Sequence, residues 1–257
     1  MKKTYLAMAV AAASLVALPA MAQDYQAEAG ISYTYIDYDN DVYSSDSVIA
    51  VDFRYNYEMV STAGKPLAEA ECLGRNGGVD FSYSDRDKYD NTNISVGADY
   101  WFNEFYAAAT YINADDGDDK ENIVAVKGGV MVDDNLRLHV GVANQGYING
   151  HQVNDETTYS VGGKLLVDVE GHYVNLEGEF QYNTDYKYVT ASGDYYITNA
   201  LSAGVGVTKT GKFDKVAVDV GAKYFVMPNV SGELAYTLNN DGVDKDNAIN
   251  LRLAARF

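Results

Sequence analysis

The chain has 257 residues and a formal net charge of −18, from 37 acidic and 19 basic side chains. So acidic a chain is a poor binder of nucleic acid, because phosphate contacts need Lys and Arg. Its single cysteine, Cys72, excludes an internal disulfide. Beyond residue 22 the sequence has no run of about eighteen apolar residues, which argues against a helical membrane protein.

The first 22 residues have the organisation of a secretory signal peptide. Lys2 and Lys3 form a charged start, an apolar segment follows, and Ala20-Met21-Ala22 is a small-x-small cleavage site. We therefore predict a signal peptide over 1–22 and one mature domain over 23–257. The alternative, an uncleaved anchor helix, is disfavoured because the apolar segment is too short to span a bilayer comfortably.

From residue 25 onward, apolar and polar residues alternate with a period of two, which is the pattern of β-strands with one apolar and one wet face. In chain order, the predicted strands lie near residues 25–35, 48–57, 79–83, 94–100, 105–111, 124–130, 136–142, 159–167, 174–182, 189–195, 201–207, 216–224, 230–238 and 247–257. About fourteen strands are expected, with twelve or sixteen as alternatives, because each strand signal is weak.

The apolar faces predict the surroundings of these strands. In the closing strand, Leu251 and Leu253 alternate with Asn250 and Arg252, and in the first strand the same alternation puts Tyr25 on the apolar face. A soluble sandwich also alternates, but aromatic residues at the ends of the apolar faces favour lipid. In lipid every backbone amide needs a partner, which for strands only a closed barrel supplies. We predict an all-β, transmembrane antiparallel β-barrel.

The connections between the predicted strands alternate in character. Those near residues 103, 134, 169, 199 and 228 are short, whereas those near 40, 88, 117, 150 and 241 are longer and mostly acidic. Short turns are expected in the periplasm and longer loops outside the cell, and an even strand count puts both termini on one side.

One connection, between the second and third predicted strands, breaks this pattern. Residues 64–74 predict one short helix, with Pro66 in its first turn and Gly74 at its stop. Because it is the longest connection on its side, we expect that it could fold inward from the periplasm and narrow a pore.

The inward face of the predicted barrel forms the candidate pore wall. Its charged and titratable residues are Asp52, Arg54, Asp80, Asp99, Lys127, Arg137, His139, Lys164, Glu177, Glu179, Asp219, Lys223, Glu233, Arg252 and Arg256. Charged side chains around a lumen set a field for ions and polar solutes. Acid exceeds base overall, so we predict a mild cation preference, which the arginines of the closing strand could reverse locally. The alternative is a solvated lumen with no selective role.

Two acidic segments invite a metal-site interpretation. Hard cations want several carboxylate oxygens, which the run Asp115–Asp119 offers, but a solvated loop is the favoured interpretation. Asp37, Asp39 and Asp41 have the spacing of a calcium loop, yet Val42 stands where that loop needs glycine. We predict no metal and no cofactor.

A catalytic constellation is not evident. The histidines are His139 in a strand, His151 in a loop and His172 at a strand start, and none is placed beside a serine on the lipid face. Glu177 and Glu179 could meet as an acid pair on one strand face, although a polar lumen wall is the favoured interpretation. We predict that the chain is not an enzyme.

The remaining alternative is a structural or adhesive barrel with a plugged interior. Eight strands fill their interior with side chains, whereas about sixteen leave a channel, so fourteen are expected to leave some space.

The terminal Arg256-Phe257, and Pro66-Leu67-Ala68-Glu69-Ala70 after the second strand, resemble the small porin family of Gram-negative outer membranes, which has about fourteen strands. The resemblance covers the whole mature chain in layout. It implies an outer-membrane location and passive passage of water, ions and small polar solutes, gated in some members. It also implies that outer-membrane lipid surrounds the barrel and that Phe257 is a signal read by the barrel-assembly machinery.

Overall fold

The computed structural model describes residues 24–38, 45–88, 91–115, 120–148, 156–184, 187–210, 215–240 and 245–257. The predicted signal peptide and most residues of the longer acidic loops lie outside the described residues, so these predictions remain predictions.

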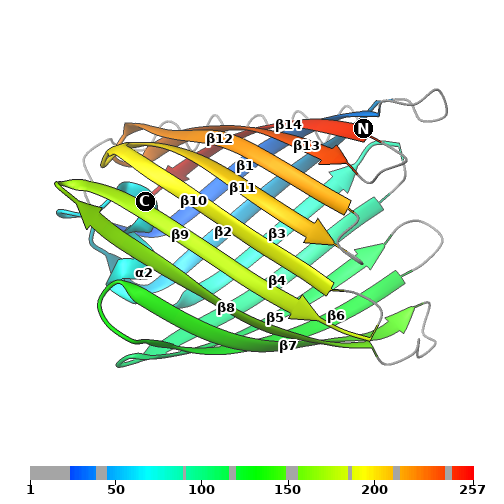
Figure 1. Ribbon diagram of the computed structural model, residues 1–257, viewed down its shortest axis with the longest axis horizontal. Helices are drawn as coiled ribbons and strands as arrows, with labels where there is room; N and C mark the ends of the chain where they lie inside the picture. The colour runs from blue at the N-terminus through cyan, green and yellow to red at the C-terminus, as the bar shows by residue number, and fades with distance from the viewer. Residues whose placement is uncertain are drawn as a thin grey trace.

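Within the described residues, fourteen antiparallel strands form one closed barrel (Figure 1). The strands are β1 Tyr25–Tyr38, β2 Asp46–Val60, β3 Gly78–Arg86, β4 Asn91–Phe102, β5 Phe105–Asp115, β6 Lys120–Met131, β7 Leu136–Ile148, β8 Glu156–Val169, β9 His172–Tyr182, β10 Lys187–Thr198, β11 Leu201–Thr210, β12 Lys215–Met227, β13 Val230–Asn240 and β14 Lys245–Arg256. Each strand pairs with its sequence neighbours, and β1 pairs with β14. The predicted all-β barrel and its fourteen strands are confirmed.

No helix among the described residues is long and apolar enough to cross a membrane.

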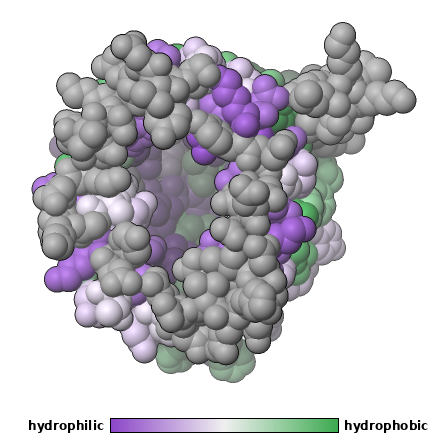
Figure 2. Space-filling view, turned by 90° about the vertical axis from the view of Figure 1, so that its right-hand side faces the viewer, coloured by the Kyte–Doolittle hydropathy of each residue, from purple (hydrophilic) through white to green (hydrophobic). Residues whose placement is uncertain are grey.

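The outer face of the barrel is apolar, as period-two alternation requires. Tyr100, Val140 and Leu253 are each about 61% exposed or more, and the even-numbered positions of β7 and odd-numbered positions of β14 continue this surface. Viewed from the end that carries the longer loops, the barrel is hollowed and hydrophilic residues line the hollow, with hydrophobic residues outside (Figure 2). The chain therefore inverts the usual soluble arrangement, with its polar residues inside.

The seam between β1 and β14 closes the barrel. Ile31 opposes Leu253 in this register. The carbonyl of Phe257 accepts hydrogen bonds from the backbone amides of Gln26 (2.9 Å) and Ala27 (2.7 Å), so the last residue continues the ladder past β14.

Tyr25 does not take the outward face that the alternation predicts, so this prediction is wrong. The β1–β2 register shifts between Tyr25 and Ala27, which marks a bulge at the start of β1. An odd number of extra residues in one strand, here three in β2, changes which residues of the two strands share a face beyond the shift. Tyr25 is consequently only 2% exposed and clusters with Val60 and Ala70.

The short turns gather at one end of the barrel, together with the carboxy-terminus and the start of β1 (Figure 1). Asn103 (φ 55°), Glu170 (φ 56°) and Gly171 (φ 86°) adopt left-handed conformations in the β4–β5 and β8–β9 turns. We call this end the turn end, and the opposite one the loop end.

Residues 61–77 connect β2 to β3 at the turn end, and we call them the insert. The insert holds a 3₁₀ turn, η1 (Leu67–Glu69), followed by α2 (Ala70–Gly74). The prediction of one helix over 64–74 is therefore wrong in its length. Gly64 (φ 69°) lies in a turn before the helix, and Arg75 (φ 53°), not Gly74, takes the left-handed position that ends it.

Candidate pore

The structure places every predicted pore-wall residue on the inner face. Asp52 and Arg54 come from β2, Asp80 from β3, Asp99 from β4, Lys127 from β6, Arg137 and His139 from β7, Lys164 from β8, Glu177 and Glu179 from β9, Asp219 and Lys223 from β12, Glu233 from β13, and Arg252 and Arg256 from β14. They contact one another across the wall or line its cavities. Their role in selectivity remains a prediction.

Two arginines of β14 bind carboxylates of β1 and β2 beside the seam. The guanidinium of Arg252 lies 2.6 Å from Asp52 and 3.0 Å from Glu28. Arg256 lies 2.6 Å from the same Glu28, and its guanidinium stacks 4.3 Å over the Tyr25 ring. The closing arginines are therefore largely neutralised where they stand.

Arg54 ties the wall to the insert. It forms an ion pair with Glu71 of α2 and another with Asp99 of β4 at 2.8 Å. Asp80 lies further away, at 3.6 Å. Burial raises the pKa of the Glu71 carboxyl above its ordinary value, and the neighbouring Arg54 guanidinium opposes that rise.

A second junction joins the insert to β8 and β10. The ammonium of Lys164 lies 2.6 Å from Glu69 of η1 and 2.6 Å from Glu177 of β9. Tyr196 of β10 donates a 2.5 Å hydrogen bond to the same Glu69. Glu69 is only 4% exposed, so its charge is stabilised almost entirely by these partners.

Closer to the loop end, Glu179 gathers three side chains. It lies 2.7 Å from Lys127 and 2.8 Å from Nε2 of His139, and it accepts a hydrogen bond from Gln181. The Nδ1 atom of His139 is buried without a hydrogen-bond partner. Glu177 is paired separately with Lys164, so the two glutamates do not form an acid pair.

The insert crosses the lumen rather than hanging below it. The amide of Leu67 donates to the carbonyl of Asn199 in the β10–β11 turn (2.8 Å), and the carbonyl of Leu67 accepts from Arg256 (2.7 Å). Arg75 pairs with Asp134 in the β6–β7 turn at 2.9 Å. Because these partners lie on opposite sides of the barrel, the insert divides the turn end of the lumen.

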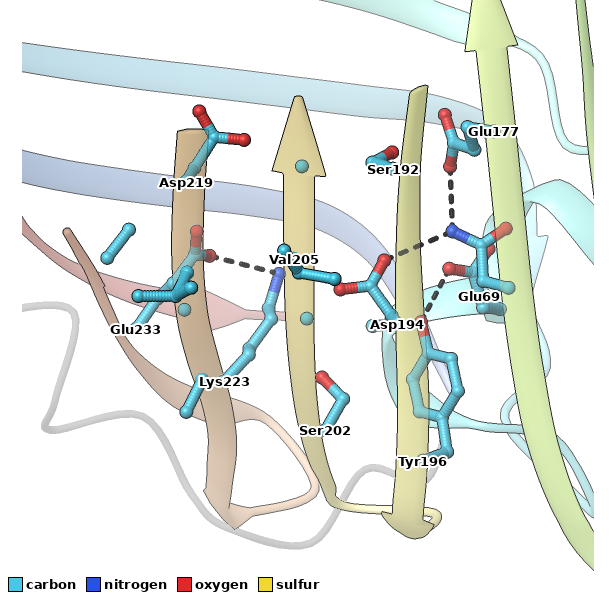
Figure 3. Close-up of a pocket in the computed structure, with 18 of the residues that line it drawn as sticks. Glu69, Glu177, Ser192, Asp194, Tyr196, Ser202, Val205, Asp219, Lys223 and Glu233 are labelled. Carbon is cyan, nitrogen blue, oxygen red and sulfur yellow. Dashed lines mark hydrogen bonds and ion pairs between the residues drawn. The ribbon is translucent and has the colours of Figure 1, made fainter. Parts of the chain in front are cut away.

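A cavity lies on each side of this partition. The larger, of about 500 Å³, is bounded by β9–β13 (Figure 3) and carries five carboxylates and one lysine: Glu69, Glu177, Asp194, Asp219, Glu233 and Lys223. The smaller, of about 250 Å³, is lined by Arg54, Glu69, Glu71, Cys72, Asp99, Trp101, Tyr106, Arg137 and Lys164. Among the residues that the structure describes, the two cavities have Ala68 and Glu69 of the insert in common.

Sequence reasoning missed several residues of this site. Asp194 and Tyr196 follow from the alternation of β10, and Glu28 from that of β1, so a complete reading of the polar faces could have found them. Glu69 and Glu71 carry no such signal, because nothing in a short irregular connection predicts where it will dock.

The other candidate groups are in part described by the structure. Asp115 pairs with Lys120 at 2.9 Å, while Asp116–Asp119, Asp39, Asp41 and His151 lie outside the described residues. His172 stacks against Tyr195. Among the described residues, no group of three His, Cys, Asp or Glu side chains is placed to hold a metal.

A family model described as "putative general bacterial porin" matches residues 1–257. The chain belongs to this porin family. A search of curated proteins finds no match. The porin is similar in fold to the Acinetobacter baumannii outer membrane protein Omp33, with a TM-score of 0.73 at 21% identity over 91% of this chain and 99% of that one. A structure titled "Bacterial polysaccharide outer membrane secretin" is more distant, with a TM-score of 0.51 at 11% identity over 91% and 99% of the two chains. The family membership places this porin in the bacterial outer membrane.

Proposed function

We propose that this porin lets water, ions and small polar solutes diffuse passively across the outer membrane of a Gram-negative bacterium, with a mild preference for cations. The observation that carries the proposal is a closed barrel whose charged inner wall surrounds cavities on both sides of the insert. A barrel whose interior is filled by apolar side chains would not have a charged inner wall around cavities.

The cation preference rests on the larger cavity. Of its five carboxylates, Glu69 and Glu177 pair with Lys164, and Glu233 lies 3.7 Å from Lys223. Asp194 and Asp219 form no ion pair among the described residues, so the cavity keeps an acidic excess. Asp219 lines the same cavity from β12. Rings of carboxylates favour cations in a pore, and the acidic excess of the whole chain acts in the same direction.

The test is single-channel recording from refolded protein in a planar bilayer under a potassium chloride gradient. Discrete conductance steps with a reversal potential of the sign expected for cations would support both parts of the proposal. An opposite sign would reject the cation preference alone. Folding is checked beforehand by heat-modifiable migration in gels.

The insert is proposed to narrow the pathway. Its anchors on Arg54, Lys164, Tyr196 and Arg256 hold it across the lumen. Removing residues 64–74 should therefore increase single-channel conductance. Unchanged conductance in a folded deletion variant would reject this role.

The same anchors favour a second candidate, a plugged structural or adhesive barrel. In that case the cavities on either side of the insert would hold water without forming a continuous path. Folded protein that inserts into the bilayer and gives no steps, while the 64–74 deletion does conduct, would support this candidate.

We further propose that residues 1–22 direct export and are removed, and that the barrel-assembly machinery reads Phe257. In support, Phe257 is 41% exposed and extends the seam between β1 and β14. Replacing it with a polar residue should reduce the amount of folded barrel in the outer membrane. An unchanged amount would reject the assembly role.

A further inference from the structure

Arg137 differs from the other arginines of the chain. All six arginines are described, and five of them form ion pairs: Arg54, Arg75, Arg86, Arg252 and Arg256. Among the described residues, Arg137 has no carboxylate within ion-pair distance, and its Nε atom is buried without a hydrogen-bond partner. A half-buried guanidinium with an unpartnered donor in a charged lumen is unusual, because buried polar groups are nearly always hydrogen-bonded.

The guanidinium is nevertheless held in place. Its central carbon lies 5.4 Å from the centroid of the Tyr106 ring, and that ring lies 5.1 Å from the ring of Trp101. An arginine stacked on an aromatic face keeps its in-plane donors free for a second partner. The stack therefore orients Arg137 without consuming its hydrogen-bonding capacity.

Arg137 also stands at a junction in the lumen. Of the described residues, it alone lines both the 250 Å³ cavity beside the insert and a 220 Å³ cavity deeper in the barrel, where His139, Thr190 and Ser192 contribute to the wall. A solute moving between these cavities along β7 must pass the guanidinium.

We propose that Arg137 binds small organic carboxylates beside β7 in the lumen. The planar guanidinium matches a carboxylate bidentately. The nearest acidic groups are engaged elsewhere, Asp99 with Arg54 at 2.8 Å and Glu177 with Lys164 at 2.6 Å. Cavities of 250 and 220 Å³ admit solutes of a few carbon atoms. The inference rests on the proposed function, since the solute must enter the lumen.

An intrinsic tryptophan can report binding at this site by its fluorescence. Trp101 is the only tryptophan, it lines the cavity beside Arg137, and it contacts the Tyr106 ring on which Arg137 stacks. Refolded protein in detergent is titrated at constant ionic strength with sodium propionate, or with the uncharged isostere propionamide, while tryptophan emission is recorded. We expect a saturable change with propionate and none with propionamide.

Two variants separate the site from a general charge effect. Arg137→Gln should weaken propionate binding about tenfold or more, the usual size of a lost charge-assisted hydrogen bond, while Lys223→Gln, in the opposite cavity, should leave it unchanged. Equal responses to propionate and propionamide, or an undiminished response in Arg137→Gln, would overturn the proposal.

Bilayer recording distinguishes this inference from the proposed function. If folded protein binds propionate but conducts no current, the proposed diffusion channel is rejected and the proposed Arg137 site is retained. If the protein conducts but its tryptophan emission shows no propionate-specific change, the channel is retained and the Arg137 site is rejected.

Discussion

The hydroxyl of Tyr196 donates a 2.5 Å hydrogen bond to the carboxylate of Glu69, across a separation of 127 residues. The bond fixes the insert, which leaves the barrel wall after β2, to β10 on the far side. The same carboxylate lies 2.6 Å from Lys164. One buried glutamate thus holds two walls to the partition between them.

Replacing this glutamate should loosen the partition. Glu69→Gln removes a charge-assisted bond and should shift the docked-to-undocked ratio of the insert by about tenfold. We expect a larger mean single-channel conductance. Glu177→Gln is the matched control, because Glu177 also pairs with Lys164 at 2.6 Å but belongs to the wall. Equal conductance in both variants would contradict the proposal that Glu69 holds the insert across the lumen.

The second prediction concerns pH and Glu71. Burial raises the pKa of this carboxyl above its ordinary value of 4.5, against the opposing effect of Arg54. The folded chain therefore binds the proton more tightly than the unfolded chain. The resulting contribution to stability is present at low pH and is lost as pH rises through the raised pKa.

Glu71→Gln should flatten this part of the stability profile. The measurement is urea unfolding in detergent micelles at a series of pH values from about 4 upward, compared between parent and variant. Asp134→Asn, at an exposed turn carboxylate, serves as the control. Parallel profiles for parent and Glu71→Gln would show that titration of Glu71 does not contribute to the pH dependence of stability.

A third prediction concerns the start of β3. A Cβ atom built on Gly78 would lie 2.4 Å from the carbonyl oxygen of Tyr55, a backbone atom that cannot yield cheaply. Gly78→Ala should therefore force β2 and β3 apart and lower the yield of heat-modifiable barrel. Gly232→Ala, whose Cβ would meet only the Leu253 side chain at 3.6 Å, should fold normally. Similar yields from the two variants would refute the steric argument.

A fourth prediction uses the single thiol. Cys72 is half-buried in α2, and burial raises the pKa of its thiol. Because the thiolate is the reactive form, a maleimide should label the folded protein slowly at neutral pH and the urea-unfolded protein quickly. If the insert undocks, the maleimide should label Cys72 faster in the Glu69→Gln variant than in the parent. Equal rates in the folded and unfolded protein would indicate that Cys72 is not shielded.

The sequence predicted the barrel because one rule governs every strand. The alternation that places Leu253 outward also places Arg252 inward, and no long-range information is needed to see it. Fourteen strands and the inward placement of residues such as Arg54 and Glu179 follow from repeated use of that rule. The rule failed at Tyr25, where the β1–β2 register shifts and the side chain turns inward.

The partners of the inner residues could not be predicted in the same way. Which carboxylate meets Arg252 depends on the register and tilt of strands that are 200 positions apart in sequence, as Asp52 and Arg252 are. The docking of the insert depends on side chains from β2, β8, β10 and β14 together. Local pattern determines a face, whereas pairing is a property of the closed barrel.

The insert comes early in the chain, but several of the groups that hold it come late. Leu67 bonds to Arg256 over 189 positions, and Glu69 bonds to Tyr196 over 127. Contacts of such separation form slowly, after the intervening chain has found its place. The insert can settle only once β10 and β14 are paired. A docked insert therefore indicates that the final strand has been added. A barrel arrested before closure would leave this segment exposed to water and to proteases.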